Sequence, residues 1–210
     1  EELAYRDYTQ GIQDNAQKAA DWMGNAPVVF GEFGSYFNFG GIEKSMARSY
    51  DLTAHILDNN YEAYEDLFLS RMVWCLSLVN DPRYGDFWNK EDFSLRGPAV
   101  FDAAGDVVDF GPWRAAEAWA RPHARAMAGI PVQTYYRSPL HYFDSEKGIV
   151  DPVGEFYVRY KAKETTAPTE IQIPRVPIAG TDADGNPVTR EFPYPDGFYV
   201  WLSDGTARYD

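Results

Sequence analysis

The sequence has little of what several protein classes require. It has one cysteine, Cys75, so no disulfide can form within the chain, and its apolar neighbours favour a packing role for this thiol over catalysis. No apolar run approaches the length that spans a bilayer. The chain has only 19 Lys and Arg but 32 Asp and Glu, and the resulting net charge of −13 argues against nucleic acid as a partner. The compartment is not fixed, although a secreted or periplasmic location is favoured.

Motifs of several enzyme classes are missing from the sequence as well. The three histidines, His55, His123 and His141, show no metal-ligand spacing, so we expect neither a metal nor another cofactor. Neither a Gly-x-Ser-x-Gly elbow nor a phosphate-binding loop occurs. The Asp-Ala-Asp-Gly-Asn run at 182–186 resembles the start of a calcium loop but lacks its terminal glutamate, so we predict a hairpin turn there.

Aromatic residues, by contrast, are abundant. The chain has 15 Tyr, 13 Phe and 6 Trp, which make up 16% of its 210 residues. Tyr and Trp have flat apolar faces with a polar edge, and such side chains suit stacking on sugar rings. β-Rich domains use many aromatic residues in any case, so composition alone leaves both interpretations open.

Helices and strands alternate in the first part of the sequence. Apolar residues at helical spacing predict helices over 8–24, 42–60 and 112–120. Short apolar runs predict buried strands over 27–31 and 68–76. Such alternation predicts a parallel sheet with helices outside it. Two parallel strands do not stand alone, so we expect the last part of a larger α/β domain.

The pattern changes near Gly129, where helical periodicity ends. Apolar alternation between turn-rich segments predicts short strands at 155–161, 169–174 and 198–203. We therefore expect an α/β domain over residues 1–129 and a small antiparallel β-sandwich over residues 130–210.

One carboxylate is distinctive because it ends the first predicted strand. Glu32 lies in a Gly-Glu-Phe-Gly run at 31–34, directly after Val-Val-Phe at 28–30. A charged residue at the end of a buried strand has no packing role, and in a β/α barrel this end is the active-site face. A carboxylate fixed there suits nucleophilic attack on a sugar carbon. A glycine-bounded turn with an exposed acid is the alternative interpretation.

The second predicted strand and its long loop supply further polar and aromatic side chains. The candidates for substrate binding are Trp74, Asn80, Asp86, Trp88 and, from the loop after Glu32, Tyr36. Asn and Asp can hydrogen-bond to sugar hydroxyls, and Trp and Tyr can stack on sugar faces. Core packing is the alternative for Trp74. A solvated acidic loop is the alternative for Asp86 and for the nearby Glu91 and Asp92.

Together these segments resemble glycoside hydrolase family 5, which has a β/α-barrel fold. The resemblance is carried by residues 27–34, by the strand with Trp74, by Gly-Asp-Phe-Trp-Asn-Lys-Glu-Asp-Phe-Ser at 85–94 and by Arg-Pro-His-Ala-Arg-Ala-Met-Ala-Gly at 121–129. The last two runs are similar to the endoglycoceramidase-like branch, in which a β-sandwich follows the barrel. The resemblance implies that Glu32 is the catalytic nucleophile and that Trp74 lines the site of the cleaved sugar.

The resemblance implies a fold class and a function. The fold is α/β, the C-terminal part of a (β/α)8 barrel with strands seven and eight, followed by a small antiparallel β-sandwich. The function is that of a retaining glycoside hydrolase of carbohydrate metabolism, which cleaves the β-glycosidic bond of a glycolipid or another β-glycoside. A non-catalytic carbohydrate-binding protein, with the barrel part as its scaffold, is the alternative.

One required part of that enzyme does not occur in this sequence. The family's acid/base glutamate lies in an Asn-Glu-Pro context, and no Asn-Glu pair exists here. The first residues, Glu-Glu-Leu-Ala, are neither a start nor a secretion signal. We therefore expect the N-terminal half of the barrel to be a partner, supplied by preceding residues or by a separate chain.

Overall fold

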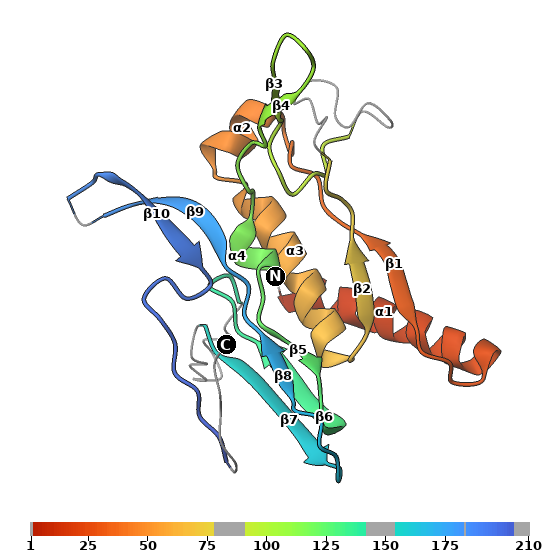
Figure 1. Cartoon of the computed structure of the whole chain (residues 1–210). Helices are drawn as coiled ribbons and strands as arrows, with labels where there is room; N and C mark the ends of the chain where they lie inside the picture. Colours follow the sequence, from red (N-terminus) through yellow and green to blue (C-terminus); the bar gives the residue numbers. More distant parts are fainter. Residues whose placement is uncertain (1, 78–90, 142–153, 183, 204–210) are drawn as a thin grey trace.

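The computed structural model describes residues 2–77, 91–141, 154–182 and 184–203. The first part contains α1 (Glu2–Met23), β1 (Val29–Phe33), α2 (Ile42–Ala47), α3 (Asp51–Asp66), β2 (Ser70–Val73), β3 (Val100–Phe101), β4 (Val107–Asp109) and α4 (Ala116–Trp119). Six strands follow, β5 (His123–Ala126), β6 (Gly129–Tyr136), β7 (Phe156–Ala162), β8 (Glu170–Gln172), β9 (Val176–Thr181) and β10 (Pro187–Phe192) (Figure 1).

The described strands form five two-stranded sheets, none of which closes into a barrel. β1 and β2 are parallel, as the alternation of helices and strands predicts, and α3 connects them. The pairs β3–β4, β5–β8, β6–β7 and β9–β10 are antiparallel. The described parallel pair therefore lies in the first part of the chain together with the β3–β4 hairpin, and the described pairs after α4 are all antiparallel.

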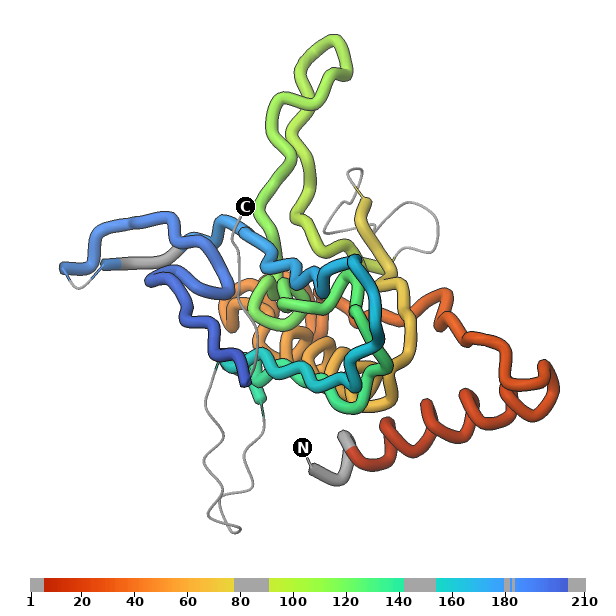
Figure 2. The backbone as a smooth tube through the Cα atoms, turned by 60° about the horizontal axis from the view of Figure 1, so that its bottom comes forward, coloured from red at the N-terminus to blue at the C-terminus, as the bar shows by residue number. Residues whose placement is uncertain are grey.

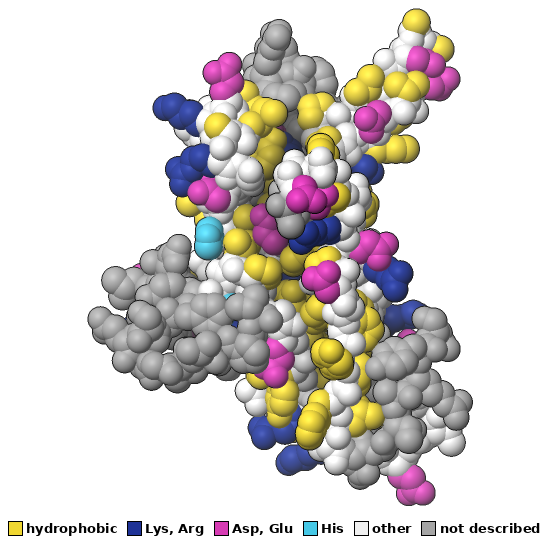
Figure 3. Space-filling model, turned by 90° about the vertical axis from the view of Figure 1, so that its left-hand side faces the viewer, with side chains coloured by type: hydrophobic (Ala, Val, Ile, Leu, Met, Phe, Trp, Pro, Cys, Tyr) yellow, Lys and Arg dark blue, Asp and Glu magenta, His cyan; other side chains and the backbone are white. Residues whose placement is uncertain are grey.

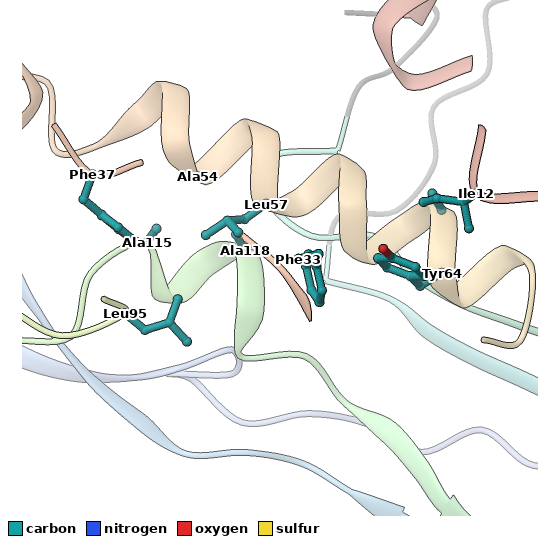
Figure 4. Close-up of a cluster of buried hydrophobic side chains, with 10 residues drawn as sticks. Ile12, Phe33, Phe37, Ala54, Leu57, Tyr64, Leu95, Ala115 and Ala118 are labelled. Carbon is teal, nitrogen blue, oxygen red and sulfur yellow. The ribbon is translucent and has the colours of Figure 1, made fainter. Parts of the chain in front are cut away.

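The main hydrophobic core surrounds α3. Ala54 and Leu57 on this helix are fully buried, and they belong to one cluster with Ala118 of α4 and Phe33 of β1. Figure 4 shows Phe33 beside Tyr64 of α3, and Ala118 below the middle of the same helix. Burying a Leu or Phe side chain stabilises a fold by about 1.5–3 kcal/mol, so this cluster fixes how β1 and α4 lie against α3.

Three elements project from this centre, as Figure 2 shows: α1, the β3–β4 hairpin and the β9–β10 hairpin. Large apolar side chains are exposed on each of the first two, for example Trp22 on α1 and Val108 on β4. Figure 3 shows exposed hydrophobic side chains along the middle of one face of the molecule, between acidic and basic ones. Within the described segments, no helix combines the length and the apolar character that a bilayer crossing needs.

Several predicted elements differ from those observed. The helix predicted over 42–60 is two helices, because Ser49 and Tyr50 have left-handed backbone angles (φ of 51° and 61°) that end α2 before α3 begins. Only Ala116–Trp119 of the helix predicted at 112–120 is helical. Residues 198–203 are irregular, so the strand predicted there is wrong.

The turn predicted at 182–186 is confirmed. β9 and β10 form an antiparallel hairpin on either side of it. One carboxylate oxygen of Asp182 accepts hydrogen bonds from the backbone N–H groups of Asp184 and Asn186. An acidic side chain that binds its own turn in this way needs no metal ion to explain its presence.

A buried arginine joins α3 to the C-terminal strands. The Arg121 guanidinium donates through Nε and Nη2 to the two carboxylate oxygens of Glu65, each at 2.9 Å, and through Nη1 to Asp58. Nη2 also donates to the carbonyl oxygen of Tyr136 in β6, at 2.8 Å. Because Asp58 and Glu65 belong to α3 and Tyr136 to β6, this one side chain joins α3 to β6.

Three acidic and three basic side chains meet in the same cluster. Arg71 of β2 donates to Glu65 at 2.9 Å, and Nδ1 of His141 lies 2.6 Å from Glu62 of α3. Burial raises the pKa of the Asp58 carboxyl from 3.8 to about 6, and its attraction to Arg121 offsets this only in part. Three carboxylates thus share two arginines and one histidine at the junction.

Candidate active site

The strand that carries Glu32 contains one extra residue. Phe30 and Phe33 both face α3, where their ring centroids lie 5.1 and 5.0 Å from that of Tyr64. Regular alternation would put residues three positions apart on opposite sides of the strand. The pairing shows how both reach α3: three steps along β1, from Phe30 to Phe33, match two steps along β2, from Arg71 to Val73. This is the geometry of a β-bulge, which re-aims side chains.

The bulge places Glu32 on the side of the strand that faces away from α3. Gly31 and Glu32 are the two residues between the phenylalanines, and both are exposed. On β2, Arg71 and Val73 contact α3 or its cluster, so Met72 lies on the opposite side, where it is 57% exposed. Glu32 therefore stands on an open face, one residue before the carboxyl end of β1.

The carboxyl ends of the two strands approach each other closely. The Trp74 backbone N–H donates to the carbonyl oxygen of Phe33 at 2.6 Å, so half-buried Trp74 follows β2 beside the end of β1. A Cβ atom on Gly34 would lie 2.2 Å from the carbonyl oxygen of Trp74, so only glycine fits at this position. The peptide bond between Trp74 and Cys75 is cis.

Tyr36 lies in the loop that follows β1. Its ring centroid is 4.3 Å from that of Phe93, and its hydroxyl donates to the Oε1 of Glu91 at 2.9 Å. The hydrogen bond to the Glu91 carboxylate raises the pKa of the Tyr36 hydroxyl. An aromatic face and a carboxylate thus stand together on the surface, and this combination can contact both the apolar and the hydroxyl-bearing parts of a sugar.

The segment around Phe93 returns to the end of β2. The carbonyl oxygen of Phe93 accepts from the Cys75 N–H at 3.3 Å, and the Leu95 N–H donates to the carbonyl oxygen of Cys75 at 2.9 Å. The Ser94 hydroxyl also donates to the carbonyl oxygen of Ser77 at 2.9 Å. These bonds hold residues 93–95 beside the end of β2, so this segment forms one wall of the candidate site.

Asp92 differs from its predicted setting. A solvated acidic loop is the expectation for this residue, but Asp92 is fully buried and forms an ion pair with Arg114. No local sequence pattern links two residues that are 22 positions apart. Glu91, in contrast, is half-buried and faces Tyr36.

The structure thus brings together Glu32, Trp74 and Tyr36 at the carboxyl ends of β1 and β2. Asn80, Asp86 and Trp88 lie outside the described residues. Sequence reasoning missed Gly34, whose contact with Trp74 becomes visible only when the strands are paired. The Gly-Glu-Phe-Gly run could have drawn attention to it, since its second glycine follows the strand directly.

Two further observations concern metal ions and cavities in the described part of the chain. Among the residues with described positions, no group of three or more His, Cys, Asp or Glu side chains is arranged to bind a metal ion. A small cavity of about 30 Å³, lined by residues that include Phe39, Ser45 and Tyr50, lies near the start of α3, and Glu32 does not line it. A space of this size is near that of one water molecule, so it would not take a sugar ring.

Comparison with known proteins adds relatives but no family assignment. No family model matches the chain. It is 26% identical to a glucosylceramidase of Rhizopus delemar over an alignment of 146 residues, which covers 63% of this chain and 21% of that protein. It is 35% identical to the ergosteryl-beta-glucosidase of Saccharomyces cerevisiae over 72 residues, 34% of this chain and 9% of that protein.

Solved structures give the same picture. Sterylglucosidase 1 of Cryptococcus neoformans matches with a TM-score of 0.50 and 22% identity in its complex with tris, and of 0.51 and 21% identity in its complex with hit 1. Each match covers 63% of this chain and 21% of the other. The chain therefore spans about a fifth or less of the length of these relatives, and over that part it is similar, at low identity, to glycoside hydrolases named for glycolipid substrates.

Proposed function

We propose that this chain is part of a retaining β-glycosidase that releases glucose from a lipid glucoside. One observation carries the proposal: the bulge in β1 turns Glu32 to the open face at the strand end, beside Trp74. The names of the relatives, a glucosylceramidase and an ergosteryl-beta-glucosidase, support glucose as the sugar and a lipid as the leaving group.

The mechanism that follows assigns one step to Glu32. Its carboxylate attacks the anomeric carbon and forms a covalent glycosyl-enzyme, while a second carboxylic acid about 5–5.5 Å away protonates the leaving oxygen. The second residue then deprotonates a water molecule, which releases the sugar from Glu32 with net retention of configuration. Trp74 supplies an aromatic face for the sugar ring beside the nucleophile.

The second acid comes, in this proposal, from the N-terminal half of the barrel. β1 and β2 then correspond to strands seven and eight of a family 5 barrel over residues 1–129, and residues 130–210 to the β-sandwich. Parallel pairing with α3 outside supports this arrangement. So does the exposed face around Glu32, where Val29 and Met72 are 55% and 57% exposed and would be covered by the remaining strands.

The decisive test is Glu32→Gln in the protein that includes the whole barrel. The substitution keeps the size of the side chain but removes the nucleophile, so hydrolysis of a β-glucosyl lipid should fall by about 10⁴-fold or more. The exposed Glu164 provides the control, and Glu164→Gln should retain wild-type turnover. Turnover that survives in Glu32→Gln would remove this residue from the mechanism.

A trapping experiment tests retention and separates hydrolysis from mere binding. A 2-deoxy-2-fluoro-β-glucoside with a good leaving group should leave one sugar attached to the Glu32 peptide, as detected by mass spectrometry. A non-catalytic carbohydrate-binding protein would bind glucosides without forming this adduct or releasing glucose. An adduct on another residue would reassign the nucleophile.

A further inference from the structure

A buried ion pair lies beneath the two loops of the candidate site. Arg114 donates through Nη1 and Nη2 to the two carboxylate oxygens of Asp92, at 2.8 and 2.6 Å. The two side chains are 2% and 0% exposed. Nε and Nη2 of the same guanidinium also donate to the carbonyl oxygen of Ser94. A planar fork that is satisfied in this way holds its partners in one geometry.

The same arginine also holds the loop that follows β1. Its guanidinium carbon lies 4.1 Å from the centroid of the Phe37 ring, which is fully buried. The Phe37 backbone N–H in turn donates to the carbonyl oxygen of Asp92 at 2.6 Å. Arg114, Asp92 and Phe37 therefore form one unit, called here the loop clamp, which joins the loop after β1 to the segment that returns to β2.

The loop clamp lies directly next to the exposed side chains of the site. Tyr36 precedes Phe37, and Glu91 precedes Asp92. Tyr36 donates to Glu91 at 2.9 Å across the two loops, and its ring packs on that of Phe93 at 4.3 Å. The buried contacts of the clamp thus set the distance between two surface side chains that stand four and 59 positions after Glu32 in the sequence.

We propose that Arg114 is a positioning residue for substrate recognition, because it fixes the wall formed by Tyr36, Glu91 and Phe93. This inference rests on the proposed glycosidase function and extends it. Arg114 is buried, so it acts through the loops and not by touching the substrate. The wall contacts parts of the β-glucoside that do not take part in bond cleavage. The Tyr36 ring packs against apolar surface of the substrate, and the Glu91 carboxylate accepts hydrogen bonds from its hydroxyl groups. Contacts of this kind change KM more than kcat.

A matched control separates positioning from general stability. Arg121 is equally buried, at 2% exposure, and is also bonded to two carboxylate oxygens of one acid, but it lies at the junction with β6. Lysine cannot reproduce the bidentate fork at either position. Both Arg114→Lys and Arg121→Lys should therefore lower the unfolding midpoint, and only Arg114→Lys should disturb the wall.

The kinetic test uses the protein with its whole barrel and a β-glucosyl lipid. Arg114→Lys and Asp92→Asn should each raise KM about tenfold and change kcat by less than about threefold, while Arg121→Lys leaves KM at the wild-type value. Equal values of KM in Arg114→Lys and Arg121→Lys would overturn the positioning role. So would a loss confined to kcat.

A second readout does not depend on activity and uses this chain directly. Nuclear Overhauser contacts between the Tyr36 and Phe93 rings should be present in the wild type and in Arg121→Lys, and lost in Arg114→Lys; Tyr36→Phe assigns the resonances. Retention of these contacts in a folded Arg114→Lys protein would overturn the clamp whatever the activity. A different outcome separates the two proposals. If Arg114→Lys loses these contacts but the protein with its whole barrel does not cleave β-glucosides, the clamp is upheld and the proposed function is overturned.

Discussion

Two buried arginines flank α4, and they do different things. Arg114, two residues before the helix, is matched by one carboxylate and one backbone carbonyl, and it binds loops to each other. Arg121, two residues after the helix, contacts the carboxylates of two acids of α3 and joins this helix to β6. The comparison shows that one residue type can serve a site or a junction, depending on which elements its partners belong to.

The largest effect should come from removing the charge at the junction. Arg121→Leu would leave Asp58 buried without its cation and Glu65 with Arg71 alone, and breaking a buried pair on one side costs about 3–5 kcal/mol of unfolding free energy. Urea unfolding followed by circular dichroism measures this. The exposed pair of Arg125 and Glu170, 3.7 Å apart, gives the control, since Arg125→Leu should cost less than about 1 kcal/mol. Equal losses in the two variants would show that burial does not distinguish them.

At the candidate site, the close backbone contact between Gly34 and Trp74 should also affect stability. In Gly34→Ala the new Cβ would meet the Trp74 carbonyl oxygen at 2.2 Å, so the strand ends must separate. Overpacking of this kind costs about 1–3 kcal/mol. Gly31 lies on the same strand with no atom within 4 Å of its Cβ position, so Gly31→Ala is the matched control and should leave stability nearly unchanged. A stable Gly34→Ala variant would show that the ends of β1 and β2 can part freely.

The last predicted effect is a dependence on pH that belongs to the junction. Because burial raises the pKa of Asp58 to about 6, the folded state holds this proton more tightly than the unfolded chain does. Its stabilising contribution is fully present below the ordinary pKa of 3.8 and is lost as the pH rises through about 6. The unfolding free energy of the wild type minus that of Asp58→Asn should therefore fall between about pH 4 and pH 6.

A carboxyl whose pKa is shifted in the opposite direction provides the control for that measurement. Hydrogen bonds from Asn186 lower the pKa of exposed Asp182, so its contribution is present above its ordinary pKa and is lost as the pH falls. The difference curve of Asp182→Asn should slope in the other direction. A flat curve for Asp58→Asn across the same range would contradict the assignment of the junction titration to this carboxyl.

The sequence predicts the local features of this molecule better than its long-range ones. The parallel strands with Glu32 and Trp74 at their ends follow from short apolar runs between helical stretches, and they are found. The break between α2 and α3 is missed because the apolar stripe continues across it, while the backbone of Ser49 and Tyr50 adopts left-handed angles.

The remaining features depend on pairings between distant segments. No periodicity marks the bulge in β1, since it is defined only against β2. The Arg114–Asp92 pair likewise joins residues from different loops, and a buried acid resembles a solvated one in the sequence. The barrel, the sandwich and the boundary at residue 129 stay predictions, because they concern how this chain combines with strands beyond β1 and β2.

The bulge also shows that the position of a residue along a strand can matter as much as its chemistry. In a regular strand, residues two positions apart lie on the same side, but the extra residue between Phe30 and Phe33 puts Glu32 on the side opposite to Phe30. Regular pairing of the same residues, without the bulge, would keep every functional group in the sequence and yet turn the acid toward the aromatic rings of α3. A carboxylate can therefore be removed from a reaction without being replaced, by removing the bulge from the strand that presents it.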